Sequence, residues 1–61
     1  MIITMRHIRE ANYCARGARL FCANHGIDWS DFVKNGIDES ELEGIDDAML
    51  ATVIEVARGQ Q

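Results

Sequence analysis

The sequence predicts an all-α protein, a small single-domain bundle of helices over residues 1–61. Three observations favour this fold. Proline is absent, alanine, glutamate and arginine are frequent, and the tripeptide Gly-Ile-Asp occurs three times at spacings that separate short helical segments. A chain of 61 residues buries only about 60% of the surface that it exposes when unfolded. A second domain and a deep pocket between lobes are therefore excluded.

A first long helix is predicted over about residues 4–25, because its residues divide into two faces at about 100° per residue. The face expected to be buried carries mainly small apolar residues, which allow another backbone to come close. These residues are Ile8, Ala11, Cys14, Ala15, Ala18, Phe21 and Cys22. Gly17 lies at the edge of the opposite face, where it costs the helix about 1 kcal/mol relative to alanine. It marks either the close approach of a neighbour or a glycine that the helix tolerates.

Each Gly-Ile-Asp tripeptide, at 26–28, 36–38 and 44–46, is predicted to end one helix and begin the next. The glycine takes the positive φ found just past a helix end, and the isoleucine folds back onto the last turn. The aspartate then caps the following helix by accepting hydrogen bonds from its free N–H groups. Asp38 and Glu41 also have the spacing of a capping box.

These boundaries predict two short helices, at about 29–35 and 39–43, and a second long helix at about 47–58. The 39–43 segment is short enough to be a 3₁₀ turn. Met49 and Val56 widen the apolar stripe of the last helix beyond the area that one partner helix covers. Either the short helices cover the remainder, or the last helix forms the contact of a homo-oligomer. The expected core consists of Ile8, Phe21, Trp29, Phe32, Leu50, Val53 and Ile54, with the three aromatic residues at its centre.

The net charge of −4 is divided unevenly along the chain. Residues 1–26 contain four arginines and one acid, whereas residues 27–61 contain nine acids and two basic residues. The arginines of the first helix share a face with a tyrosine and a leucine, and we expect this face to bind a protein partner. Its residues are Arg6, Arg9, Tyr13, Arg16, Arg19 and Leu20. A solvated face, or one that pairs with the chain's own acidic half, is the alternative interpretation.

Nucleic-acid binding is a second alternative for the same face, because arginines with an interleaved tyrosine can follow phosphates and stack on bases. Residues 29–45 also have the length of a helix-turn-helix with Gly36 in the turn. The helix that would enter the groove carries four acids within residues 38–43, and a polyanion repels them. Nucleic acid is therefore disfavoured relative to a protein.

The histidines and cysteines do not predict a metal site. His7 and His25 would lie about 27 Å apart on a straight helix, too far to ligate one ion. Cys14 and Cys22 would lie about 12 Å apart along the same helix, beyond the reach of a disulfide, so we expect reduced thiols. No nucleophile elbow, phosphate loop or HExxH motif occurs. The sequence therefore predicts a non-enzymatic protein without a metal or cofactor.

No segment predicts export or membrane insertion. Met1-Ile2-Ile3 is too short an apolar run for a signal peptide, and no stretch approaches the roughly 18 apolar residues of a spanning helix. We therefore expect a cytoplasmic protein that does not interact with membranes, a compartment that fits reduced cysteines.

Four short motifs follow one another along the chain. The motifs are Arg6-His7-Ile8-Arg9, Tyr13-Cys14-Ala15-Arg16-Gly17-Ala18-Arg19, His25-Gly26-Ile27-Asp28-Trp29-x-x-Phe32 and Asp47-Ala48-Met49. Together they resemble a group of very short proteins encoded in tailed phages and prophages of proteobacteria, over about residues 5–58. The resemblance implies a phage or prophage origin, in the host cytoplasm or the virion, and brings no assigned activity. We expect a small accessory protein that acts as an interaction module, with a nucleic-acid-binding regulatory protein as the alternative.

Overall fold

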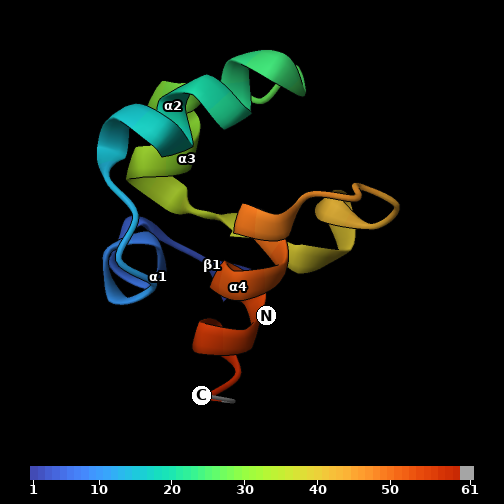
Figure 1. The fold of residues 1–61 in the computed structure, drawn as a ribbon. Coiled ribbons are helices and arrows are strands. Elements are labelled where there is room, and N and C mark those ends of the chain that lie inside the picture. The colour runs from blue at the N-terminus through green and yellow to red at the C-terminus, as the bar shows by residue number, and fades with distance from the viewer. Residues whose placement is uncertain (60–61) are drawn as a thin grey trace.

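The computed structural model describes residues 1–59, and these residues are mostly helical (Figure 1). The elements in chain order are β1 (Ile2–Ile3), α1 (Met5–Glu10), α2 (Ala15–Asn24), α3 (Trp29–Asn35), β2 (Ile37–Asp38), the 3₁₀ helix η1 (Glu39–Leu42) and α4 (Ala48–Ala57). Helix α1 contacts both α4 and α2, and α2 contacts α3. Figure 1 shows α2 and α3 together on one side of the molecule, with α4 on the other.

The predicted first helix over 4–25 is wrong, because the chain turns between α1 and α2. Asn12 has a φ of 66°, in the left-handed region. Its N–H donates to the carbonyl of Arg9 at 2.9 Å, and the N–H of Tyr13 donates to the carbonyl of Ile8 at 3.0 Å. This pair of bonds is the Schellman arrangement that ends a helix, with asparagine in the position that glycine usually takes. Asparagine tolerates this conformation better than other residues with a Cβ, so it ends α1.

The glycines of the three Gly-Ile-Asp tripeptides have the predicted positive φ. The values are 69° at Gly26, 75° at Gly36 and 84° at Gly44. Consequently α3 ends at Asn35 as predicted, and the 39–43 segment is a 3₁₀ helix that ends at Leu42. The boundaries at these glycines follow from local backbone conformation alone.

Two of the three predicted aspartate caps are correct. The carboxylate of Asp28 accepts a hydrogen bond from the N–H of Asp31 at 3.1 Å. That of Asp38 accepts one from the N–H of Ser40 at 2.9 Å. The third cap is wrong by one residue, because α4 is capped by Asp47, which accepts from the N–H of Leu50 at 3.1 Å.

The fold is not purely helical, because β1 and β2 form a small antiparallel sheet in which Ile2 pairs with Asp38 and Ile3 with Ile37. The all-α prediction is wrong in this respect. Gly36 makes the pairing feasible. A Cβ at position 36 would lie 2.6 Å from Ile2 Cγ2 and 2.7 Å from the carbonyl oxygen of Ile3. The N-terminal strand therefore crosses the chain at a point where no side chain intervenes.

The core lies where β1, α1, α2, α3, η1 and α4 meet. Its buried residues are Ile3, Ile8, Ala18, Cys22, Phe32, Leu42, Leu50 and Val53. Phe21, Trp29 and Ile54, which the sequence placed in the core, are half-buried at its edge. The centre is aliphatic, because Ile3 and Val53 are only 2% and 1% exposed. No helix within residues 1–59 is long and apolar enough to cross a membrane.

Candidate functional site

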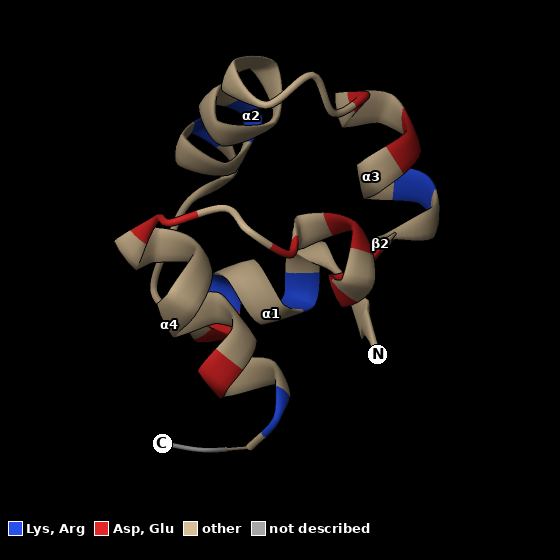
Figure 2. Cartoon of the chain, turned by 90° about the vertical axis from the view of Figure 1, so that its right-hand side faces the viewer, with Lys and Arg blue, Asp and Glu red and all other residues tan. Residues whose placement is uncertain are grey.

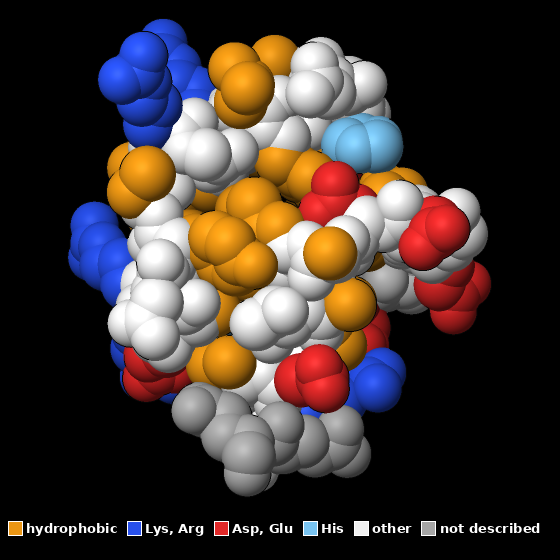
Figure 3. All heavy atoms as spheres, viewed as in Figure 1, with side chains coloured by type: hydrophobic (Ala, Val, Ile, Leu, Met, Phe, Trp, Pro, Cys, Tyr) orange, Lys and Arg blue, Asp and Glu red, His pale blue; other side chains and the backbone are white. Residues whose placement is uncertain are grey.

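The predicted arginine face is divided between two helices. Arg6 and Arg9 lie on the exposed side of α1, and Arg16 and Arg19 lie on the exposed side of α2. Figure 3 shows Lys and Arg side chains along one edge of the molecule, over the two helices. We call Arg9, Arg16, Arg19 and Leu20 the arginine edge. The turn at Asn12 therefore bends the predicted face but leaves its charges on one side.

The arginine edge has no acidic partner in the part of the chain that the structure describes. Arg6 lies outside this set because its Nε is 3.9 Å from Glu10 Oε2, an exposed pair one turn apart on α1. Within residues 1–59, Arg9, Arg16 and Arg19 take part in no ion pair. The interpretation that these arginines pair with the acidic half of the chain is therefore wrong.

The acidic residues lie mainly on the other elements, and several of them have local partners. Figure 2 shows Asp and Glu at the beginnings of α3 and α4 and around η1. Asp28, Asp38 and Asp47 are the caps described above. Glu39 Oε2 accepts a hydrogen bond from Arg58 Nη2 at 2.7 Å, and Glu39 Oε1 is 3.9 Å from the N-terminal amine. Much of the negative charge thus serves the helix starts and the contact between the two ends of the chain.

Leu20 and Tyr13, the two uncharged members of the predicted face, differ in exposure. Leu20 is 65% exposed, the highest value among the large hydrophobic residues described. Tyr13 is half-buried and packs against the core. Leu20 therefore adds an accessible apolar surface beside Arg16 and Arg19, whereas the ring of Tyr13 is used mainly in folding.

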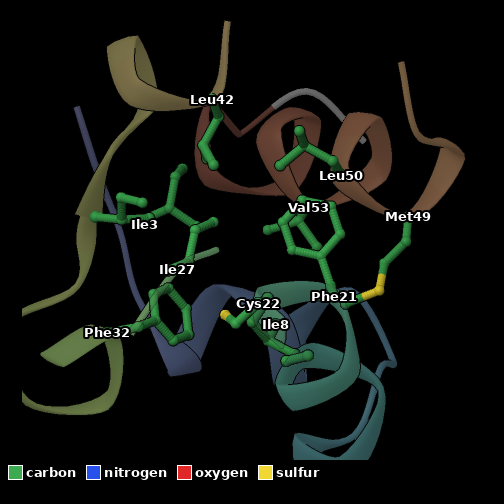
Figure 4. A pocket seen from close by; sticks show the side chains of 12 residues that line it. Ile3, Ile8, Phe21, Cys22, Ile27, Phe32, Leu42, Met49, Leu50 and Val53 are labelled. Atoms are coloured by element: carbon green, nitrogen blue, oxygen red, sulfur yellow. The ribbon is translucent and has the colours of Figure 1, made fainter. Parts of the chain in front are cut away.

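An apolar groove separates α2 from α4 beside the arginine edge. Figure 4 shows the side chain of Phe21, from α2, meeting that of Met49, from α4, at this groove. Figure 3 shows hydrophobic side chains gathered between the two helices on the same face of the molecule. The groove is lined by Ile3, Ile8, Ala18, Phe21, Cys22, Ile27, Phe32, Ile37, Leu42, Met49, Leu50 and Val53. It therefore opens the edge of the core to the surface.

The two cysteines are free thiols in opposite environments. Cys22 is buried, and burial raises the pKa of its thiol. Cys14, which the sequence placed on the buried face, is exposed at the start of α2. The backbone N–H of Gly17, in the first turn of α2, lowers the pKa of the Cys14 thiol, with a smaller contribution from the charge of Arg16. One helix continued through Asn12 would place Cys14 on its buried face, so the exposure of this thiol was not predicted from the sequence.

The two histidines each have a structural contact. His7 Nδ1 accepts a hydrogen bond from the N–H of Thr4 at 3.0 Å, which satisfies a free donor at the start of α1. The ring of His25 packs on Phe21, with ring centroids 4.4 Å apart. Residues 1–59 contain no group of three or more histidine, cysteine or acidic side chains placed to hold a metal ion.

Comparisons of the chain with family models, with curated proteins and with solved structures find no match. The arginine edge and the groove beside it are therefore the features from which a function can be inferred.

Proposed function

We propose that the chain is a small non-enzymatic accessory protein of a phage or prophage, and that its arginine edge binds another protein. One observation carries this proposal: Arg9, Arg16 and Arg19 are exposed and lack ion pairs within residues 1–59, although the chain is acidic overall. The phage setting comes from the resemblance of the sequence motifs.

The chemistry of the arginine edge fits a protein partner that carries carboxylates. A guanidinium group binds a carboxylate through two parallel hydrogen bonds, and it is less strongly hydrated than an ammonium group. Arginine is enriched in protein interfaces for this reason, together with large apolar residues that fill the centre of the contact. Leu20 is exposed one helical turn after Arg16 on α2 and provides such an apolar contact.

Nucleic acid remains the alternative ligand, because the same guanidinium groups also bind phosphates. Two features disfavour it. The net charge is −4, so the molecule as a whole repels a polyanion. Residues 39–42 form a single 3₁₀ turn, and this segment is too short to act as the recognition helix that a helix-turn-helix places in the major groove.

The proposal is tested by affinity capture from lysogenic or infected cells, followed by mass spectrometry. We compare the natural chain with the double variant Arg16→Glu, Arg19→Glu and with the control Lys34→Glu, a charge reversal on the exposed side of α3. Circular dichroism verifies that all three chains fold. We expect the double variant to lose the captured phage or host proteins and the control to keep them.

Two outcomes would contradict the proposal. The first is a folded double variant that captures every partner in the same yield as the natural chain. The second is retention of the natural chain on DNA or heparin with a steep dependence on salt, which would indicate phosphate binding instead.

A further inference from the structure

The side chain of His7 holds the junction between β1 and α1. Its Nδ1 lies 3.0 Å from the backbone nitrogen of Thr4, the N-cap residue of α1, and 3.3 Å from Thr4 Oγ1. A backbone N–H can only donate a hydrogen bond, so this contact requires an unprotonated Nδ1 that accepts it. Glutamate or glutamine usually makes this bond in a capping box. Here their place is taken by a side chain that gains a proton close to neutral pH.

The bond secures a residue on which two elements depend. The carbonyl of Thr4 accepts hydrogen bonds from the N–H groups of His7 at 3.1 Å and Ile8 at 3.3 Å, and these bonds begin α1. Ile3, the residue before Thr4, is buried in the core and pairs with Ile37 of β2. The N–H of Thr4 has no other acceptor within residues 1–59. The imidazole of His7 therefore fixes the point at which β1 ends and α1 begins.

A proton on Nδ1 removes this acceptor. The N–H of the imidazolium and the backbone N–H of Thr4 would then point at each other across 3.0 Å. Thr4 Oγ1 can accept from the imidazolium, but the backbone donor is left without a partner. An unpaired donor away from water is costly, and both residues are half-buried. The junction must therefore open before water can reach this N–H.

No ion pair compensates for the lost hydrogen bond. Strand β1 has no charged side chain, and α1 packs mainly against α4 and α2. The charged side chains on these three helices are Arg6, Arg9, Glu10, Arg16, Arg19 and Glu55. Within residues 1–59 none of them forms an ion pair with His7, and neither does the N-terminal amine. The protonated ring would therefore gain no carboxylate partner in its present position.

We propose that His7 makes the fold sensitive to mild acid. When its imidazole is protonated, Thr4 loses its hydrogen bond and the junction between β1 and α1 loosens, together with the strand that carries Ile3 into the core. This conformational response is independent of what the arginine edge binds.

The direction of the pH effect follows from the two states of the chain. In the unfolded chain an imidazole takes up a proton at about pH 6.5, whereas the folded chain must break the bond from Thr4 to do so. The unfolded chain therefore binds more protons as the pH falls below this value, and stability falls with it. Aspartate and glutamate titrate mainly below about pH 5, so the interval between pH 7 and pH 5.5 reports on histidine.

Urea denaturation across this interval, followed by circular dichroism, measures the effect. We expect the unfolding constant of the natural chain to increase about fivefold from pH 7 to pH 5.5. His7→Gln keeps an acceptor at the usual capping-box position but cannot be protonated, so its unfolding constant should change by less than about twofold. His25→Gln is the matched control, because His25 is exposed and its ring packs on Phe21. This control should keep the fivefold response.

Nuclear magnetic resonance of the natural chain gives a second measurement, which a general loss of stability would not change. At pH 7 the nitrogen shift of His7 Nδ1 should be that of an unprotonated ring nitrogen. Between pH 7 and pH 5.5, in the folded chain, the amide proton of Thr4 should move upfield as the ring of His7 becomes protonated, because it loses its acceptor.

Three results would overturn the inference: the same pH response in His7→Gln as in the natural chain, loss of the response in His25→Gln, or a Thr4 amide signal that stays in place while the ring of His7 is protonated. The last measurement uses the natural chain, so it decides the question even where His7→Gln does not fold. None of these results bears on the proposed function, which the capture experiment tests separately.

Discussion

Gly36 and Gly26 have similar φ angles, yet their surroundings differ. Both have positive φ, at 75° and 69°. A Cβ at position 26 would lie in open space, whereas one at position 36 would collide with Ile2 and with the backbone of Ile3. At Gly26 the lack of a side chain only permits a left-handed turn. At Gly36 it also permits the N-terminal strand to cross the chain.

We therefore expect Gly36→Ala to destabilise the protein by about 3 kcal/mol or more, and Gly26→Ala by about 1–2 kcal/mol. The left-handed conformation costs a residue with a Cβ about 1–2 kcal/mol at both positions. At position 36 the backbone of β1 must also move, because the carbonyl oxygen of Ile3 would lie only 2.7 Å from the added Cβ. Urea denaturation followed by circular dichroism measures both losses. Equal losses of stability in the two variants would show that the close approach of β1 adds nothing to the cost of a side chain at position 36.

Cys14 is expected to be the faster of the two thiols to react with iodoacetamide. Its pKa is lowered mainly by the backbone N–H of Gly17, so at neutral pH more of the thiol is in the reactive thiolate form. Cys22 is buried, and burial raises its pKa, which keeps it protonated and inaccessible. Mass spectrometry of timed samples gives the rate at each cysteine over a range of pH. The pH midpoint for Cys14 in the folded chain should lie below the midpoint for the same cysteine in urea, and a midpoint at or above that value would contradict the lowered pKa.

At the level of the secondary-structure elements, the sequence predicts best what short-range chemistry determines. The start and the end of α3 follow from the aspartate cap at Asp28 and from the positive φ of Gly36. The turn at Asn12 escaped prediction because asparagine is compatible with both a helix interior and a helix end. The β1–β2 pairing escaped because it joins residues 34 and 36 positions apart along the chain. The arginine face was predicted from the helical spacing of its residues, but its division between α1 and α2 depends on that turn.

Asn12→Ala distinguishes the turn from a continuous helix by the sign of its effect. In a continuous helix alanine would stabilise the chain, because it has the highest helix propensity. In the observed turn, with φ at 66°, alanine loses the tolerance of asparagine for the left-handed conformation, so we expect a destabilisation of about 1 kcal/mol. Asn12→Gly should be tolerated, because glycine is the usual residue at this position. Thermal denaturation of the two variants measures both effects, and an increase in melting temperature for Asn12→Ala would contradict the turn.

At the scale of the whole molecule, the two ends of the chain hold the helices together. The N-terminal amine and Arg58 both approach Glu39 in η1, and the N–H of Glu39 donates to the carbonyl of Met1 at 2.9 Å. These contacts are partly exposed, and such ion pairs contribute little stability. The stronger connection is Ile3, which β1 inserts into the core among residues from the helices. The first three residues therefore belong to the core of the fold, although the sequence analysis treated them only as a short apolar run.

Ile3→Ala and Ile2→Ala make a matched test of that connection, because the two residues are adjacent, chemically identical and on opposite faces of β1. Ile3 is 2% exposed and Ile2 is 47% exposed. Truncating a buried isoleucine to alanine costs about 2–5 kcal/mol, and a chain of 61 residues has a total stability of only roughly 3–9 kcal/mol. We therefore expect Ile3→Ala to remove a large part of the free energy of unfolding, and Ile2→Ala to lower it by less than about 1 kcal/mol. Urea denaturation measures both. Similar losses would mean that β1 lies on the surface as an appendage, whereas a large difference would establish that the helices depend on the strand to close their shared core.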